Sequence, residues 1–383
     1  MDFDIIVFGG GIAGLWLGNV LANAGYNFIL IENDKLGGGQ TLASQGMIHG
    51  GQKYVLQGAL SPSAEALGRM PQRWQACFKG EGDADLTGVQ FLSETQVMWA
   101  AGRAPGVWAA ARFVNAKTKK LSRSDFPDVL RQDESFRGPV YALPEKVLEV
   151  RSLVTCLAAN LDSRVFKGDL VEMSPGGTVV VSGQTLRARF VIFTAGIGNE
   201  FALEKLHVKG RRAQRRPLRQ VMVRPLPSAL FGHGIAHSHN PRVTVTSHPI
   251  TGGSYVWYLG GNVAEKGAVL DELAALDFAR KELAQIFPRV DWRAKEWATW
   301  LGDRAEPLDA KGRLPPGPSV AQHDRTLVAW PTKLTFVPAL SDRILAVLAA
   351  NNVPRSPRSA PPPFPPAKIG YYPWETAQWR ALA

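Results

Sequence analysis

Residues 4–8 (DIIVF) run directly into residues 9–14 (GGGIAG), and this junction decides the fold. The first segment is almost entirely apolar, as expected for a strand that is buried on both faces. Apolar residues then recur at helical spacing, which predicts a helix from about Ile12 to Ala24 that ends at Gly25. A second apolar segment, residues 28–32 (FILIE), predicts another buried strand. This order of strand, turn, helix and strand predicts an α/β fold with a Rossmann-like domain.

The glycines of the turn fit the pattern G-x-G-x-x-G, and each of them has a mechanical role. Gly9 permits the tight turn, Gly11 lets backbone amides approach a diphosphate, and Gly14 allows the helix to pack closely on the strand. The N-terminus of the helix adds unsatisfied N–H donors and the positive end of the helix dipole.

The predicted second strand ends in an acid, Glu32, 18 residues beyond Gly14. A carboxylate at this point accepts hydrogen bonds from both ribose hydroxyls of a dinucleotide. The pattern therefore predicts a dinucleotide site, against the alternative of a glycine-rich turn in another α/β fold. The predicted contact residues are Gly9, Gly11, Ile12, Ala13, Gly14, Glu32 and Asn33.

The composition is that of a folded protein of two or three domains, because 45% of the 383 residues are hydrophobic. No apolar run reaches the roughly 18 residues that a membrane-spanning helix needs. The two cysteines, Cys77 and Cys156, argue against a disulfide scaffold, a zinc site or a dithiol pair. The histidines lack metal-ligand spacing, so we predict no metal site. Because the N-terminus lacks an export signal, we expect a cytoplasmic protein.

Lysine and arginine exceed aspartate and glutamate by 44 to 33, a net charge of +11 that favours anionic partners. Between Lys209 and Arg224 the chain is basic with no acidic residue. No aromatic side chain interrupts this segment, so we expect a solvated basic face rather than a nucleic-acid site. Peripheral contact with an anionic membrane surface stays open.

A second glycine-rich and polar segment spans residues 37–54, soon after Glu32. A nicotinamide-binding domain would ordinarily continue into another strand–helix unit here. This segment is typical instead of backbone that lies along an extended cofactor. The residues assigned to that contact are Gln40, Thr41, Ser44, Gln45 and Gly46.

The segment resembles the D-amino-acid oxidase superfamily of FAD enzymes, in the branch with glycerol-3-phosphate dehydrogenase and 2-hydroxyglutarate oxidase. In that branch a Thr/Ser-rich loop and an Ile-His-Gly-Gly-like turn, here residues 48–51, pass beneath the flavin. The resemblance extends to residues 189–196 (RFVIFTAG), 302–304 (GDR) and 330–335 (WPTKLT). Pro331 and Thr332 stand where the family has two glycines.

The resemblance implies FAD as the cofactor and further contact residues. Val171 would contact the adenine end through its backbone, and Ala195 and Gly196 would lie beside the diphosphate. Lys333, Leu334 and Thr335 would form a loop at the flavin. Because the chain has no second G-x-G-x-x-G and no dithiol pair, we expect electrons to leave to oxygen, a quinone or a protein carrier.

The expected FAD domain is discontinuous, because an antiparallel-looking block interrupts it. It comprises residues 1–78, 145–200 and 301–350, with strands near 170–173 and 179–181 and helices at 146–161 and 339–350. Residues 79–144 and 201–300 form a mainly antiparallel substrate domain, with a helix from Asp271 to Phe287. Residues 351–383 form a proline-rich tail, either disordered or wrapped along the surface.

The chemistry that the resemblance implies is hydride removal from a CH–OH or CH–NH carbon to flavin N5. Lys333 would supply positive charge near flavin N1 and O2, against the alternative of an exposed loop lysine. His49 is the candidate proton acceptor, although a structural role fits it equally well. Arg304 would hold a substrate carboxylate or phosphate, against an ion pair with Glu306 or Asp303.

We expect CH–OH oxidation of a small anionic substrate, a hydroxy acid or polyol phosphate, because the matches lie closest to the glycerol-3-phosphate dehydrogenase branch. One alternative is an amine or amino-acid oxidase. Another, from a different class, is a basic flavin-binding factor that docks on RNA or membrane through residues 209–224.

Overall fold

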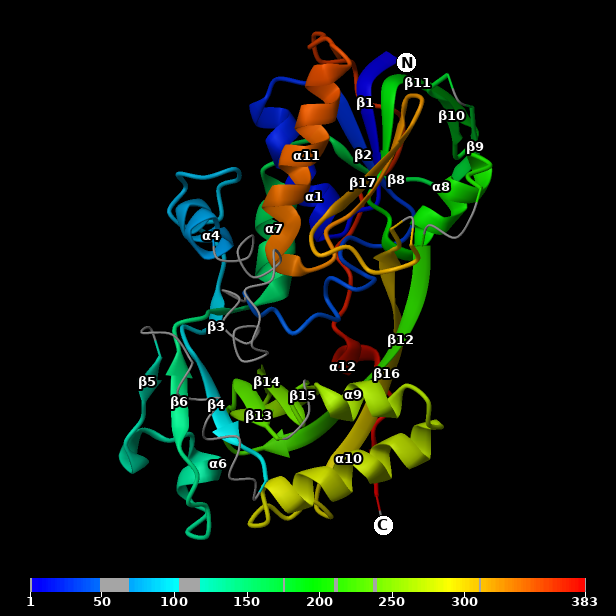
Figure 1. Ribbon diagram of the computed structural model, residues 1–383. Helices are drawn as coiled ribbons and strands as arrows, with labels where there is room; N and C mark the ends of the chain where they lie inside the picture. Colours follow the sequence, from blue (N-terminus) through cyan, green and yellow to red (C-terminus); the bar gives the residue numbers. More distant parts are fainter. Residues whose placement is uncertain are drawn as a thin grey trace.

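The computed structural model describes residues 2–48, 69–102, 118–174, 176–209, 213–236, 240–309 and 311–382. His49 lies outside these residues. Two sheets organise the described chain, one above the other in Figure 1. None of the helices among these residues is both long and apolar enough to cross a membrane.

The predicted strand–helix–strand unit is present with nearly the expected bounds. Strand β1 (Asp2–Phe8) leads into helix α1 (Ile12–Asn23), and strand β2 (Phe28–Glu32) follows. β1 pairs in parallel with both β2 and β11 (Gln184–Phe193), so it is buried on both faces, as its apolar run predicted.

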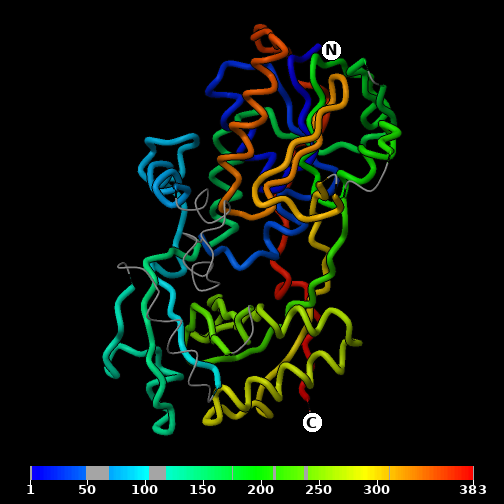
Figure 2. Tube along the Cα trace, viewed as in Figure 1, coloured from blue at the N-terminus to red at the C-terminus, as the bar shows by residue number. Residues whose placement is uncertain are grey.

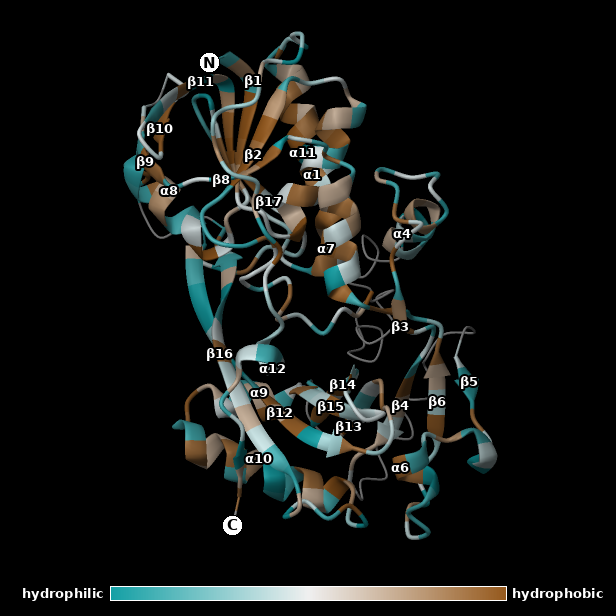
Figure 3. Cartoon of the chain, turned by 180° about the vertical axis from the view of Figure 1, so that it is seen from behind, coloured by the Kyte–Doolittle hydropathy of each residue, from teal (hydrophilic) through white to brown (hydrophobic). Residues whose placement is uncertain are grey.

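The first sheet has eight strands among the described residues, in the order β17-β18-β11-β1-β2-β8; β10 also pairs with β11, and β9 pairs with β10. Its further strands are β8 (Val165–Lys167), β9 (Leu170–Met173), β10 (Thr178–Val181), β17 (Ser319–His323) and β18 (Thr326–Trp330). Figure 3 shows the central strands β1 and β2 as strongly hydrophobic.

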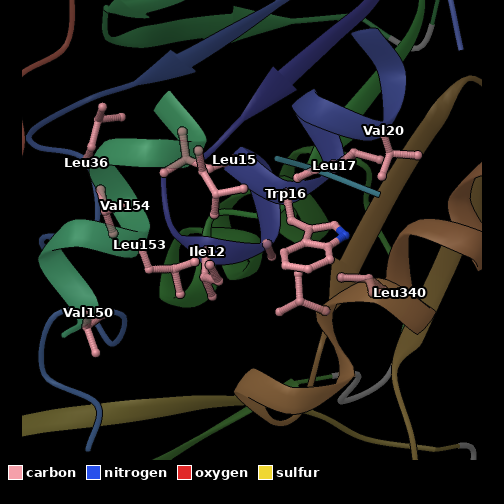
Figure 4. Close-up of a cluster of buried hydrophobic side chains, with 14 of the residues drawn as sticks. Ile12, Leu15, Trp16, Leu17, Val20, Leu36, Val150, Leu153, Val154 and Leu340 are labelled. Carbon is pink, nitrogen blue, oxygen red and sulfur yellow. The ribbon is translucent and has the colours of Figure 1, made fainter. Parts of the chain in front are cut away.

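Helices α1, α7 (Val150–Ala159) and α11 (Val337–Ala350) cover one face of the first sheet. Leu15 and Trp16 of α1 are fully buried against the neighbouring helices, as Figure 4 shows. Trp16 also packs on Trp74 of α4 (Met70–Phe78), with 4.6 Å between ring centres. The helix expected at 146–161 is shorter than predicted, because residues 147–148 form strand β7 instead.

The second sheet has nine strands among the described residues, in the order β19-β16-β12-β15-β14-β13-β4-β6-β5. Their bounds are β4 (Gln96–Ala100), β5 (Lys119–Lys120), β6 (Val140–Leu143), β12 (Ala213–Leu226), β13 (Gly232–Ile235), β14 (Val243–Ile250), β15 (Ser254–Gly260), β16 (Glu296–Pro307) and β19 (Arg380–Ala381). Helices α9 (Asn262–Gly267) and α10 (Glu272–Ile286) lie on its outer side (Figure 1). Helix α10 lies where a helix was expected from Asp271 to Phe287, whereas β16 and β19 extend beyond the residues expected for the antiparallel block.

The remaining short elements connect these parts. They are β3 (Phe91–Ser93), β7 (Val147–Leu148), α6 (Asp128–Arg131), α8 (Asn199–Lys205), α12 (Pro373–Thr376) and the single turns η1 (Arg123–Asp125), η2 (Gly196–Gly198) and η3 (Leu334–Phe336).

The expected domain boundary at residue 301 falls inside β16, which pairs with β12 from Glu296 to Pro307 without a break. This ladder is a long two-stranded ribbon that rises from the second sheet toward the first (Figure 1). A boundary at residue 301 is therefore wrong for the second sheet, because backbone pairing continues past it.

The proline-rich tail, residues 351–382, is wrapped along the protein. It runs past the edge strand β8, where Phe166 and Pro366 form an antiparallel bridge. It then passes the loop after β2 through a bridge between Leu36 and Ile369. Its last described residues form β19 on β16 of the second sheet, so the tail spans both sheets (Figure 2).

Candidate active site

The turn between β1 and α1 has the tight geometry that its glycines predicted. Gly9 has a φ of +105°, which favours glycine. A Cβ on Gly14 would lie 1.9 Å from the carbonyl oxygen of Gly9, and a Cβ on Gly10 would lie 2.4 Å from Leu36. Gly11 caps α1 without a side-chain hydrogen bond, and the first helical turn contains no acidic residue. The helix N-terminus is therefore suited to an anion such as a diphosphate.

Glu32 is held beside this turn by two backbone amides. Its Oε2 accepts a hydrogen bond of 2.6 Å from Gly10 N, and its Oε1 accepts one of 2.9 Å from Asp34 N. Because each carboxylate oxygen has a second lone pair, both remain able to accept from ribose hydroxyls. Asn33, the next residue, is exposed. The donor set and the glycine cradle fit a dinucleotide.

The loop from Leu36 to Ile48 connects the dinucleotide turn with the second sheet. Thr41 Oγ1 accepts a hydrogen bond of 3.0 Å from Ile12 N, the first amide of α1. Gln40 Nε2 donates to the carbonyl of Asp303, and Gln45 Nε2 donates to that of Tyr258. Ser44 Oγ accepts from the amide of Gly46. The loop therefore links the dinucleotide turn to both strands β15 and β16, and its predicted contact with the cofactor stays a prediction.

The end of β11 lies against the same turn. A Cβ on Gly9 would meet the Cα of Ala195 at 2.6 Å, and Thr194 Oγ1 lies 3.2 Å from the carbonyl oxygen of Gly9. Ala195 and Gly196 are thus brought to the predicted diphosphate position. Val171 is 53% exposed in β9, three residues after Gly168, whose amide donates to the carbonyl of Glu32. This places β9 at the Glu32 end of the site.

The face of the second sheet that is turned toward the first sheet carries buried polar side chains, a feature absent from our sequence predictions. We call it the polar floor, and its residues are Gln96, His233, Thr244, Thr246, His248 and Tyr258. In β14 the polar floor residues alternate with Val243 and Val245, which face the apolar core under α10. That alternation, in residues 243–248 (VTVTSH), was the available sequence signal.

Gln96 and Thr246 of the polar floor have unsatisfied hydrogen-bonding capacity, as does Nε2 of His248 within the described residues. Within the described part of the chain, the amide of Gln96 and the hydroxyl of Thr246 have no hydrogen-bond partner, although both side chains are fully buried. Thr246 lies directly across from Tyr258, which lies across from Met222. Buried polar groups without partners are costly in a folded protein, so they mark a place where a ligand would supply the missing bonds.

Comparison with known proteins agrees with this geometry. The family model described as "FAD dependent oxidoreductase" (DAO) matches residues 4–330. The chain belongs to the DAO family of FAD-dependent oxidoreductases. It is 40% identical, over 98% of both chains, to a Pseudomonas aeruginosa protein named probable FAD-dependent oxidoreductase PA4991. FAD is therefore the cofactor of this DAO-family enzyme.

Solved structures give the same fold. The crystal structure of PA4991 matches with a TM-score of 0.84 at 37% identity over 98% of each chain. Glycine oxidase from Geobacillus kaustophilus matches with a TM-score of 0.61 at 18% identity, over 94% of this chain and 96% of that one. An L-amino acid deaminase from Proteus myxofaciens matches with a TM-score of 0.65 at 13% identity, over 95% and 93%. The last two show a shared DAO fold.

In this DAO-family chain, Lys333 lies at the start of the turn η3, which leads directly into α11. Burial lowers the pKa of Lys333 below its usual value. The side chain is therefore not the exposed loop lysine of the alternative interpretation. Leu334 is half-buried, and Thr335 is buried with its carbonyl accepting from Trp74 Nε1 at 3.1 Å. The role of Lys333 in supplying positive charge to the flavin stays a prediction.

Thr332, beside Lys333, has a φ of +61°. This left-handed conformation strains a β-branched residue and favours glycine. The family has glycine here, so the chain keeps the backbone shape of the motif while changing the residue. The Thr332 hydroxyl donates to the carbonyl of Pro331 at 2.6 Å.

Arg304 lies in β16 and pairs with a different acid from those we expected. Its Nη2 is 2.8 Å from Glu265 Oε1 in α9, whereas Glu306 pairs with Arg216. Arg304 lies six residues along β16 from Ala298. Ala298 pairs with Met222, which in turn pairs with Tyr258 of the polar floor. At about 3.3 Å per residue, this is roughly 20 Å. The structure therefore does not bring Arg304 to the polar floor.

The polar floor contains two histidines, His233 and His248. Nδ1 of His233 lies 2.9 Å from Thr244 Oγ1. Complete burial lowers the pKa of His248 to about 3, so this side chain is neutral at physiological pH. His49, the predicted proton acceptor, lies outside the described residues.

Proposed function

We propose that this FAD-dependent oxidoreductase removes a hydride from a CH–OH carbon of a small anionic substrate that binds on the polar floor. The observation that carries the proposal is the pair of buried, unpartnered groups at Gln96 and Thr246. An amide and a hydroxyl are uncharged, and together they can both donate to and accept from a substrate hydroxyl. The resemblance of residues 48–51 and 333–335 to the glycerol-3-phosphate dehydrogenase branch supports the same choice.

In this proposal each residue of the chain has a stated task. FAD, when bound, supplies the electron-accepting ring, and oxygen, a quinone or a protein carrier then takes the electrons. Thr246 and Gln96 orient the substrate hydroxyl, and Lys333 places positive charge near the flavin loop. His49 would accept the hydroxyl proton.

Arg304, the anchor expected from the sequence, is not part of the substrate site in this proposal. Glu265 already occupies its Nη2, so an incoming carboxylate or phosphate would have to displace this acid. A hydroxy acid or a polyol phosphate bound on the polar floor is too short to span the roughly 20 Å to Arg304. An Arg304→Met variant should therefore leave kcat/KM for hydroxy acids and polyol phosphates near the wild-type values.

Oxidation of a CH–NH carbon is the second candidate. Proteins named glycine oxidase and L-amino acid deaminase share this fold, and their names place amino acids as their substrates. The polar floor can also orient an amine. The two candidates differ only in the atom next to the reacting carbon, so a substrate screen separates them directly.

The ion pairs of the basic segment support a small-molecule enzyme over a factor that docks on RNA or membrane. Arg215 pairs with Glu200, Arg216 with Glu306, and Arg224 with Glu296. Much of this positive charge is thus paired with acidic side chains of the same chain.

The two thiols without a disulfide, Cys77 and Cys156, fit a cytoplasmic location.

The test is an anaerobic screen in which substrates bleach the flavin absorption near 450 nm. The panel contains 2-hydroxy acids, polyol phosphates and amino acids. We expect hydroxy compounds to bleach the purified holoenzyme. Bleaching by amino acids alone would replace the proposal with the second candidate, and bleaching by none would refute both.

A Thr246→Val variant tests the polar floor itself. The replacement is nearly isosteric and removes an unpartnered buried hydroxyl, so stability should be unchanged or higher if Thr246 serves the substrate. Activity, as kcat/KM, should fall about tenfold, which corresponds to the loss of one hydrogen bond of about 1.4 kcal/mol. Thr185→Val, on an exposed position of β11, is the matched control. An active and unchanged Thr246→Val enzyme would remove Thr246 from the site.

A further inference from the structure

Two aromatic residues of the tail are buried at the polar floor. The ring of Trp374 lies 3.9 Å from that of His248 and 5.4 Å from that of Tyr258, measured between ring centres. Tyr372 stacks on Trp374 at 4.3 Å with an angle of 15° between the planes. In Figure 1 this part of the tail, helix α12, lies between the two sheets. The tail is therefore part of the interior at this point.

The position of Trp374 is fixed by contacts on both sides of it. The Tyr372 hydroxyl bonds to Glu149 and accepts from the amide of Arg151 at the start of α7. Glu375 closes the short helix by accepting from the amide of Tyr372 at 2.8 Å. Further along, β19 pairs with β16. A side chain held in this way can act as a rigid wall.

Trp374 covers the two neighbours of Thr246. His248 is two residues from Thr246 on the same face of β14, so the two side chains lie about 7 Å apart. Tyr258 lies directly across from Thr246 on β15. The loop from Leu36 to Ile48 also contacts Tyr258, whose hydroxyl donates to Ala43 O at 2.9 Å. The unpartnered hydroxyl of Thr246 thus lies next to a region closed by Trp374.

We propose that Trp374 forms the wall of the substrate site at its His248 end and limits the size of substrate that the enzyme accepts. The proposal rests on the proposed function, because it takes the polar floor at Thr246 as the substrate-binding surface. A buried indole presents a large, rigid and mostly apolar surface. A chain extending from the reacting carbon toward His248 would meet this ring, so short substrates are favoured over long ones.

The experiment compares Trp374→Ala with Trp374→Phe in the holoenzyme. Tyr371→Ala is the matched control, because it removes an exposed aromatic side chain from the same tail. The measured quantity is the ratio of kcat/KM for 2-hydroxyvalerate to that for lactate, and the same ratio for norvaline and alanine. We expect Trp374→Ala to raise this ratio at least tenfold, since each methylene that fits a pocket changes discrimination by about 10-fold or more. The ratio for Trp374→Phe should stay nearer to the wild-type ratio, and the ratio for Tyr371→Ala should equal it.

A Trp374→Ala enzyme with full FAD content and an unchanged ratio of kcat/KM values would refute the proposal that Trp374 limits substrate size. Where Trp374→Ala does not fold, Trp374→Leu carries the same test, because leucine keeps an apolar side chain but is smaller than tryptophan.

A readout without turnover separates this proposal from the proposed function. If no compound of either series reduces the wild-type enzyme, the proposed function has failed. Binding of acetate, butyrate and benzoate is then followed through the shift that they cause in the flavin absorption spectrum. If Trp374→Ala binds benzoate at least fivefold more tightly than wild type while its acetate affinity is unchanged, the proposed role of Trp374 is supported. Equal benzoate affinities in the two enzymes would refute it.

Discussion

The hydroxyl of Tyr258 donates a hydrogen bond of 2.9 Å to the carbonyl oxygen of Ala43, which joins the polar floor to the loop from Leu36 to Ile48. Both residues are buried, and burial raises the pKa of Tyr258 well above its usual value. The hydroxyl therefore stays protonated and remains a donor throughout the working pH range. One contact thus ties the second sheet to the segment that follows the dinucleotide turn.

A Tyr258→Phe variant should lose this tie and leave the Ala43 carbonyl buried without its donor. We expect the free energy of unfolding to fall by about 1–3 kcal/mol and FAD to dissociate faster. Urea unfolding and the rate of flavin fluorescence increase on dilution measure the two effects. Tyr371→Phe, at an exposed position, should change neither. Equal FAD retention in Tyr258→Phe would show that the loop is held by its other contacts alone.

The Gly14→Ala variant tests the packing of α1 on β1. Its added methyl group would lie 1.9 Å from the carbonyl oxygen of Gly9, a distance that forces the helix away from the strand. We expect loss of FAD, seen as a loss of absorbance at 450 nm relative to 280 nm in purified protein. Gly39→Ala is the matched control, because a Cβ at Gly39 meets nothing within 4 Å. Full FAD content in Gly14→Ala would contradict the assignment of this turn.

Thr332→Gly should stabilise the protein. A threonine at a φ of +61° costs of order 1–3 kcal/mol in backbone strain, and glycine costs about 0.5–1 kcal/mol in lost chain entropy. The expected net gain is about 1 kcal/mol in the free energy of unfolding, measured with denaturant. A lower stability would mean that the hydrogen bond from Thr332 to Pro331 outweighs the strain.

His248 should make stability depend on pH. Its pKa in the folded protein is about 3, below the ordinary value of 6.5 in the unfolded chain. The unfolded state therefore takes up a proton first as the pH falls, so the contribution is complete above about pH 6.5 and is lost progressively toward pH 3. Relative to His248→Phe, wild type should lose about 1.4 kcal/mol per pH unit in this window. Parallel stability curves for the two proteins would show that His248 is not held neutral by the fold.

Lys333→Met tests the charge at the flavin loop. Sulfite adds to flavins more tightly when positive charge stabilises the product, so we expect at least tenfold weaker sulfite binding in this variant. Lys311→Met, at an exposed position, is the control. Unchanged sulfite affinity in Lys333→Met would remove Lys333 from this role.

The dinucleotide half of the site was predictable because its signals are local. The strand, glycine turn and helix from Asp2 to Asn23 lie within consecutive residues, and Glu32 ends the next strand. Each of these features is set by spacing and by steric needs of the backbone. The motif at Lys333 was predicted from residues 333–335 (KLT), and Thr332, where the family has glycine, has the left-handed conformation that favours glycine.

The substrate half was not predictable in the same way, because it depends on pairing between distant strands. Thr246 and Tyr258 become neighbours only through the register of β14 and β15. Trp374 reaches His248 from more than a hundred residues further along the chain. For Arg304, the sequence offered nearby Glu306 and Asp303, yet folding brings Glu265 of α9 to it instead.

The bridge between Phe166 and Pro366 has a consequence for association between molecules. Lys167 N donates to Pro365 O, and Ala367 N donates to Val165 O, so both flanking bonds of the tail point inward to β8. The backbone of Pro366 therefore points outward, and proline has no N–H group. A strand from another molecule that approached this border would find no donor at residue 366, so the proline discourages intermolecular β-pairing and aggregation there.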